Sequence, residues 1–124
     1  MNWNLQQQRQ KAFCEAMSSE FYAVAPDQKV GISRNILEAA LPIYGLRIAP
    51  EGDSNGWYIW AGRELSLFED FFLPLHVKHL DDWSPDVVKF LALAPGWRFI
   101  KAGDYENVWF DENLLPPGNV ADQA

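Results

Sequence analysis

Cysteine and histidine are scarce in this sequence. Its 124 residues include one cysteine, Cys14, and two histidines, His76 and His79. A single cysteine excludes a disulfide within the chain and every metal site built from paired cysteines. We expect Cys14 to be a buried, inert thiol, because it lies among apolar residues of a predicted helix.

Basic residues are also few. Ten Lys and Arg stand against seventeen Asp and Glu, which gives a formal net charge of −7. This balance argues against nucleic acid and anionic membrane as partners and favours a basic protein partner. The alternative is that the charge serves only solubility. No apolar run reaches the length of a membrane span, and the first residues, MNWNLQQQRQ, contain no apolar signal core. We therefore expect a cytoplasmic protein.

Recognisable catalytic motifs are missing as well. The chain contains no glycine-rich phosphate loop and no GxSxG nucleophile motif. His76 and His79 would share one helical face if residues 75–80 were helical, and with Asp81 or Asp82 they could ligate a metal. A partly exposed histidine pair beside an acidic turn is the simpler interpretation. We expect no catalytic residue, no metal and no cofactor, so the predicted protein is not an enzyme.

What the chain has in abundance is apolar and aromatic residues. Hydrophobic residues make up 48% of it, including six Trp, eight Phe and four Tyr. This composition and length predict one folded domain over residues 1–115. The tail at 116–124, PPGNVADQA, is predicted to be disordered.

Hydrophobic periodicity predicts two helices. Apolar residues recur at three- and four-residue steps from Asn4 to about Ala25, which is typical of an amphipathic helix ended by Pro26. The residues of this apolar face are Leu5, Ala12, Phe13, Ala16, Met17, Phe21 and Val24. Ser84, Pro85 and Asp86 form a helix-start signal, and the second helix would run from there to about residue 93. It would bury Val87, Val88, Phe90 and Leu91.

Alternating patterns predict strands at 29–36, 42–48, 57–61, 97–101 and 107–110, and residues 75–80 fit either a strand or a short helix. The turn-rich segment 49–56 should join two of these strands as an antiparallel hairpin, and the last two strands lie on either side of a turn at 102–106. The predicted fold class is α+β: an N-terminal amphipathic helix, a small, mainly antiparallel sheet of about four to five strands, and a second helix near residues 84–93.

Acidic residues gather in two stretches. Residues 64–86 hold six acids and one base, and residues 102–124 hold five acids and no base. Both contain aromatics that look exposed: Phe71, Phe72, Trp83, Tyr105 and Trp109. Aromatics rimmed by acids are typical of a protein-binding surface. The alternative is that the rings belong to the core and the acids are solvated. The candidate partner-binding residues are Glu69, Asp70, Asp81, Asp82, Trp83, Asp104, Tyr105 and Glu106.

Several segments resemble the immunity-protein-33-like domain family. They are VGISRN at 30–35, PIYGLRI at 42–48, DSNGWYIWAG at 53–62 and WSPDVV at 83–88, with a looser likeness over 95–111. The resemblance spans residues 30–111 and leaves the first helix outside. It departs from the family pattern at the extra Asn55, at Trp60 where Phe is expected, and at Ile48–Ala49 where the family has an Arg-Glu-like ending.

The resemblance implies an α+β domain that binds and neutralises a cognate bacterial toxin. It brings no catalytic residues, and it marks Gly56, Trp57 and Gly62 as motif positions, which we interpret as structural. If the toxin is a nuclease, its basic groove would match the acidic residues. The alternatives are a small regulatory or adaptor domain that binds another protein or peptide, and an uncharacterised hydrolase or metalloenzyme. Homo-oligomerisation stays open.

Overall fold

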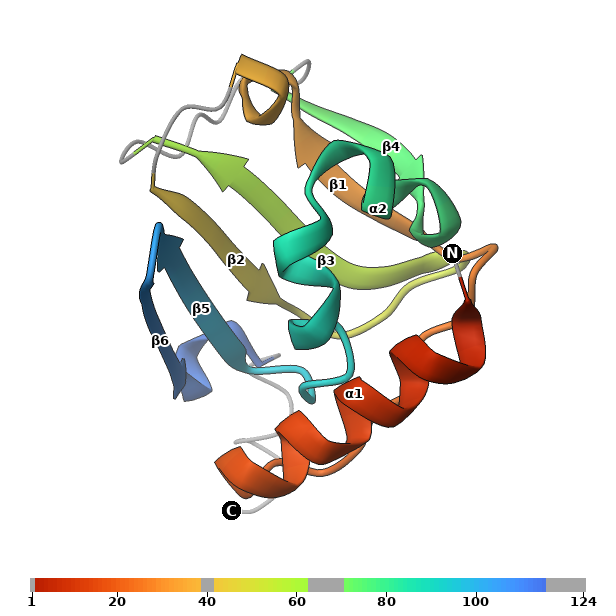
Figure 1. The fold of residues 1–124 in the computed structure, drawn as a ribbon, viewed down its shortest axis with the longest axis vertical. Coiled ribbons are helices and arrows are strands. Elements are labelled where there is room, and N and C mark those ends of the chain that lie inside the picture. The colour runs from red at the N-terminus through yellow and green to blue at the C-terminus, as the bar shows by residue number, and fades with distance from the viewer. Residues whose placement is uncertain (1, 39–41, 63–70, 116–124) are drawn as a thin grey trace.

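A six-stranded sheet forms the centre of the fold (Figure 1). The structure, a computed structural model, describes residues 2–38, 42–62 and 71–115. The strand order is β4-β1-β3-β2-β5-β6, and only β1 and β3 pair in parallel within it. The strands are β1 (Lys29–Ser33), β2 (Ile43–Arg47), β3 (Ser54–Ala61), β4 (Phe72–His76), β5 (Trp97–Ala102) and β6 (Tyr105–Phe110).

Helices pack on one face of this sheet. Figure 1 shows α1 (Trp3–Met17) and the segment of η2 (Val77–His79), α2 (Leu80–Trp83) and η3 (Pro85–Phe90) in front of the strands. The 3-10 turns η1 (Arg34–Glu38) and η4 (Glu112–Leu114) follow β1 and β6. The predicted α+β class, the β2–β3 hairpin and the β5–β6 hairpin are confirmed.

The sheet has one more strand than predicted. The extra strand is β4, which contains Pro74 and pairs with β1 alone among the described residues. Proline weakens a strand prediction because it lacks an N–H group, but an edge strand tolerates it where that group would face away from the ladder.

The predicted first helix is too long, since α1 ends at Met17. Ser18 adopts a left-handed conformation with φ 60°, and its N–H donates to Cys14 O and Glu15 O, which closes the helix. The chain then runs extended, and Tyr22 N–H donates to Ala92 O. Tertiary contacts therefore override the apolar periodicity that continues to Val24.

The buried face of α1 is also rotated relative to the prediction. Gln10 and Cys14 are buried, whereas the predicted inward residues Leu5, Ala12 and Ala16 are exposed. Gln10 Nε2 donates to Val88 O at 2.9 Å. A buried glutamine is compatible with this face because its amide nitrogen is hydrogen-bonded to η3.

The second helix begins differently from the prediction. Ser84 makes no side-chain capping hydrogen bond, and residues 85–90 form a 3-10 helix that follows the short helix α2. Its buried residues are nevertheless those predicted: Val87, Val88, Phe90 and Leu91 are almost inaccessible to solvent.

The core lies between the helices and the central strands. The rings of Phe90 and Phe99 stack with centroids 4.3 Å apart, and Trp57 packs against Phe99 at 5.6 Å. Gly45 on β2 permits this stack, because a Cβ there would lie 2.1 Å from Phe99 Cε2. The core therefore links three central strands to the η3 segment.

Candidate protein-binding surface

The predicted partner-binding residues fall into two described groups. Asp81, Asp82 and Trp83 lie on α2, and Asp104, Tyr105 and Glu106 lie on the β5–β6 hairpin. The predicted pair Glu69 and Asp70 lies outside the described residues.

A shallow depression brings these two groups together. Asp81 and Glu106 both line it, and its volume is about 340 Å³. Three basic residues, Arg9, Lys89 and Lys101, line it as well. The depression is therefore of mixed charge, because the fold inserts bases from α1, η3 and β5 between acids that are clustered in sequence. The other lining residues are Gln6, Pro85 and Asp86.

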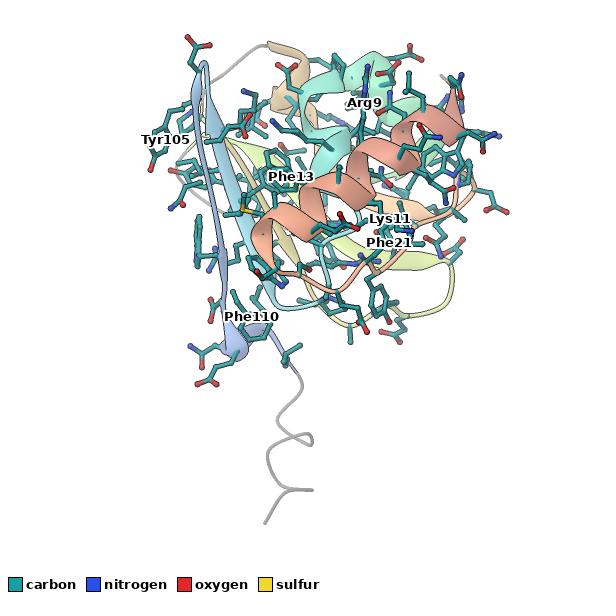
Figure 2. All side chains as sticks on the ribbon, turned by 60° about the horizontal axis from the view of Figure 1, so that its bottom comes forward. Arg9, Lys11, Phe13, Phe21, Tyr105 and Phe110 are labelled. Atoms are coloured by element: carbon teal, nitrogen blue, oxygen red, sulfur yellow. The ribbon has the colours of Figure 1, made fainter. Side chains whose placement is uncertain are left out.

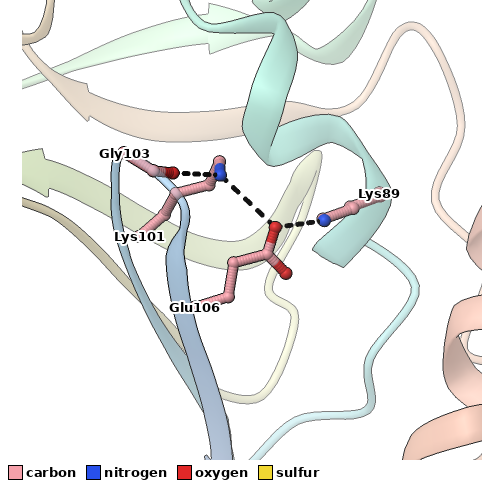
Figure 3. A network of polar contacts seen from close by, with 4 residues as sticks. All are labelled: Lys89, Lys101, Gly103 and Glu106. Carbon is pink, nitrogen blue, oxygen red and sulfur yellow. Dashed lines mark hydrogen bonds and ion pairs between the residues drawn. The ribbon is translucent and has the colours of Figure 1, made fainter.

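Glu106 is the centre of a small ion-pair network (Figure 3). Its Oε1 atom accepts hydrogen bonds from Lys89 Nζ and, at 3.3 Å, from Lys101 Nζ. Lys101 Nζ also donates to Gly103 O at 2.7 Å. The hydrogen bond from Lys89 is the main reason that the carboxyl pKa of Glu106 is lowered, with Lys101 contributing further. The network fastens the hairpin to η3.

Exposed aromatic residues mark both ends of β6. Tyr105 is 57% exposed and Phe110 is 50% exposed, and Figure 2 shows them near opposite ends of the strand. Asp104 beside Tyr105 is exposed too. The sequence prediction missed Phe110, although its position at the end of an alternating apolar strand was a usable signal.

The other aromatics predicted to be exposed are partly covered. Trp83 packs against the hydrophobic core, so its predicted role as an exposed anchor is not supported by its position. Phe71 and Phe72 contact each other edge-to-face with centroids 4.9 Å apart. The Arg98 guanidinium lies over the Trp109 ring, with its Cζ atom 5.7 Å from the ring centroid. Of these five aromatic residues, Tyr105 alone is exposed, and the other four are partly buried.

A further aromatic cluster lies on the sheet face opposite the core. Tyr44 and Trp60 stack at 5.6 Å, and Tyr58 meets Phe72 edge-to-face at 5.2 Å. Side chains alternate across a strand, so these residues point away from core residues such as Trp57. The segment WYIWA at residues 57–61 has large apolar or aromatic side chains at both odd and even positions, so the sequence contained a signal for a second apolar face of the sheet.

The family-motif residues Gly56, Trp57 and Gly62 lie at the ends of β3 and in the core. Gly56 has φ +93°, and a Cβ there would lie 2.0 Å from Ile48 O. Trp57 is fully buried, and its Nε1 donates to Leu91 O at 2.8 Å. Gly62 follows β3 with φ +88°, and its N–H donates to Pro42 O. These residues hold the β2–β3 hairpin and tie it to the turn after η3.

Arg47 supports the same turn, and the sequence prediction gave it no role. It is 1% exposed, and its Nη1 lies 3.0 Å from Leu91 O and 2.8 Å from Leu93 O. Burial lowers the pKa of its guanidinium to about 10. The usable signal was its position on β2, because Arg47 shares the inward alternation of Ile43 and Gly45.

The two histidines considered as metal ligands lie on different elements. His76 is on β4 and His79 is on η2, so they do not share a helical face, although their ring centroids lie 6.2 Å apart. Within residues 2–38, 42–62 and 71–115, no group of three His, Cys, Asp or Glu is arranged to hold a metal ion. Cys14 is buried, as predicted, and burial raises its thiol pKa.

Comparison with known proteins identifies the family. The sequence model of the Imm33-like domain matches residues 9–111, from within α1 to the end of the β5–β6 hairpin. The chain belongs to the Imm33-like domain family. The match begins earlier than the resemblance over residues 30–111 suggested, so it includes most of α1.

No curated protein and no solved structure matches this Imm33-like chain. In the described part of the chain, no helix combines the length and the apolar character needed to cross a membrane.

Proposed function

We propose that this Imm33-like domain is an immunity protein that binds a cognate bacterial toxin in the cytoplasm and blocks it. The observation that carries the proposal is the family match over residues 9–111, because the family is named for immunity. In this proposal the protein acts by binding and not by catalysis. Asp82 of the α2 group and Asp104 of the hairpin group are exposed, and they supply the charge that attracts a basic toxin.

The surface that we assign to the toxin runs from α2 across the depression to the hairpin and β6. Tyr105 is the exposed aromatic on it, and Asp81 and Glu106 form its centre. Because Glu106 is already paired with Lys89 and Lys101, its contribution to a partner is smaller than that of Asp82 and Asp104. Tyr105 supplies apolar contact area, as aromatic anchors do in protein interfaces.

The first test is neutralisation. The candidate toxin is the product of a neighbouring gene, expressed in a host with and without this chain. We expect growth only when the chain is present, and a purified complex of equal stoichiometry. If the toxin stays active although this chain is present in soluble, folded form, the proposal is overturned. Capture of a regulatory protein instead would favour the adaptor alternative.

The surface assignment is tested by charge reversal. Asp82→Lys and Asp104→Lys should each slow association with the toxin and weaken binding about ten-fold at low salt, since rim charges act mainly on the association rate. Glu20→Lys is the matched control, because Glu20 is exposed and lies beyond the end of α1. Association rates can be measured by biolayer interferometry. Equal effects of all three reversals would contradict the assigned surface.

A further inference from the structure

The two edges of the sheet are protected very differently. β4 carries the exposed residue Pro74 at its middle, and a proline cannot donate to an added strand. β6 is six residues long, contains neither proline nor lysine, and pairs with β5 in an unbroken register. Its one charged side chain, Glu106, is engaged by Lys89 and Lys101. Within the described residues β6 pairs with no second strand, so it is an unprotected edge.

The hairpin geometry shows which β6 backbone groups are free. Ala102 and Tyr105 flank a two-residue turn that has Gly103 at φ +61°, and such a turn is closed by a hydrogen-bonded pair. At the far end, Asp111 N–H donates to Gly96 O at 2.7 Å. Hydrogen-bonded and non-hydrogen-bonded pairs alternate along an antiparallel ladder. Residues 105, 107, 109 and 111 therefore face β5, and the amides of Glu106, Val108 and Phe110 point outward.

An apolar groove runs beside these outward amides. It lies between α1 and β6, has a volume of about 200 Å³, and is lined by Phe13, Met17 and Val108 together with Glu106 and Asn107. Side chains of a strand added to β6 would point alternately into this groove and toward the opposite sheet face. The groove therefore selects an aliphatic residue at every second position of such a strand.

Charge decides which strand fits. Asp104 and Glu112 lie just beyond the two ends of β6 and are exposed, whereas Glu106 and Asp111 are paired with Lys89 and Arg98. A second copy docked antiparallel about Val108 would place Asp104 opposite Glu112 of the other chain at both ends. Like charges directly opposite each other are destabilising. A strand with basic residues at its ends would instead meet opposite charge.

We propose that β6 is a docking edge that accepts an extended segment of alternating aliphatic and basic residues from the partner protein. The partner's backbone would pair with the outward amides and carbonyls of Glu106, Val108 and Phe110, its aliphatic side chains would fill the groove, and its cations would meet Asp104 and Glu112. This inference rests on the proposed function for the partner's identity as the toxin, and it states how that partner is held.

The edge can be tested without the toxin. The ¹⁵N-labelled full chain is titrated with the peptide Ac-Lys-Val-Lys-Val-Lys-Val-Lys-NH₂, and amide hydrogen exchange is measured residue by residue. At a free peptide concentration ten times its Kd, we expect exchange at Glu106, Val108 and Phe110 to slow about ten-fold, since exchange then occurs only from the free fraction. The amides of Asn107 and Trp109, already bonded to β5, exchange slowly before the peptide is added, and any further slowing there reports the overall stabilisation by bound peptide and not new pairing.

Two control peptides separate strand pairing from charge. Ac-Lys-Pro-Lys-Pro-Lys-Pro-Lys-NH₂ carries the same charge but lacks alternate N–H groups, and we expect no alternate-residue protection with it. Ac-Glu-Val-Glu-Val-Glu-Val-Glu-NH₂ can pair but meets Asp104 and Glu112, so it should bind more weakly than the lysine peptide. Equal protection by the Lys-Pro peptide, protection confined to the α2 group, or no protection at millimolar lysine peptide would overturn the proposal. If the three outward amides become protected as protein concentration rises in the absence of peptide, the occupant of the edge is a second copy of this chain and the proposed occupant is wrong.

The same exchange experiment on a toxin complex separates the two proposals. A toxin that binds and is neutralised without slowing the three outward amides would refute the docking edge and leave the immunity proposal standing. Alternate-residue protection by the lysine peptide, together with failure to neutralise any neighbouring toxin, would support the edge and refute the immunity proposal.

Discussion

At the residue scale, the buried Arg47 decides how the turn after η3 is held. Its guanidinium donates to the carbonyl oxygens of Tyr22, Asn55, Leu91 and Leu93 at 2.8–3.0 Å. Burying a charge is costly, and the lowered pKa of about 10 reflects that cost. Leu91 O also accepts from Trp57 Nε1, but the buried carbonyls of Asn55 and Leu93 would lose the donor that Arg47 supplies. Leaving buried carbonyls without this donor costs more than burying the paired guanidinium.

Arg47→Met should therefore destabilise the fold. Methionine keeps much of the aliphatic stem but removes every donor, so we expect the free energy of unfolding to fall by about 2–4 kcal/mol. Arg34→Met is the matched control at an exposed arginine and should change it by less than about 0.5 kcal/mol. Urea unfolding followed by tryptophan fluorescence measures both. A loss below about 1 kcal/mol for Arg47→Met would mean that the carbonyls find water instead.

At the element scale, the Glu106 network joins the β5–β6 hairpin to η3. The hydrogen bond from Lys89 lowers the carboxyl pKa of Glu106 in the folded state. A lowered folded-state pKa means that the stabilisation is fully present above the unfolded pKa, about 4.3 for glutamate, and is lost as pH falls through the folded value. The partly exposed position limits the effect, since solvent screens such pairs.

Glu106→Gln should accordingly lower stability by up to about 1 kcal/mol at pH 7. The difference from the wild type should shrink as pH falls through the lowered folded pKa of Glu106, because the wild-type carboxylate then becomes protonated as well. Glu112→Gln, at an exposed glutamate, is the control and should show little difference at either pH. Thermal unfolding at several pH values checks this. A Glu106→Gln difference that persists at acid pH would assign the effect to packing and not to charge.

The elements also show how far the sequence prediction reached. The β5–β6 hairpin, the β2–β3 hairpin and the buried residues of η3 were predicted because each depends on local alternation or turn chemistry. The end of α1 and the strand β4 were not. The first depends on Ser18 adopting a left-handed conformation and on the Tyr22–Ala92 hydrogen bond, and the second on edge placement of Pro74. These are properties of the assembled fold.

The candidate surface was predictable in its parts but not in its charge. Asp81 and Glu106 were both selected from sequence, and the fold places them on one depression. The same depression contains Arg9 and Lys89, which lie outside the acidic stretches in sequence. A charge run along the chain therefore does not give the charge of the surface, because packing interleaves elements from different regions.

At the scale of the whole molecule, Cys14 reports whether α1 opens alone or together with the sheet. Its side chain is 1% exposed within the central core cluster, and burial raises its thiol pKa, so the folded thiol reacts poorly with disulfide reagents. α1 is joined to η3 by the Gln10–Val88 hydrogen bond and by the Phe13–Phe90 contact. Its release would expose the core beneath it.

We therefore expect labelling of Cys14 to require global unfolding. At pH 8 the labelling rate should be at least about 10³-fold below that of the urea-unfolded chain, given ordinary domain stabilities. The opening free energy from labelling should equal the free energy of unfolding from urea titration. The matched control moves the thiol to the exposed face of the same helix, as Cys14→Ala with Ala12→Cys, and should label rapidly. An opening free energy well below the global value would show that α1 undocks as a separate unit, and would place Phe13 and Met17 of the groove on a movable element.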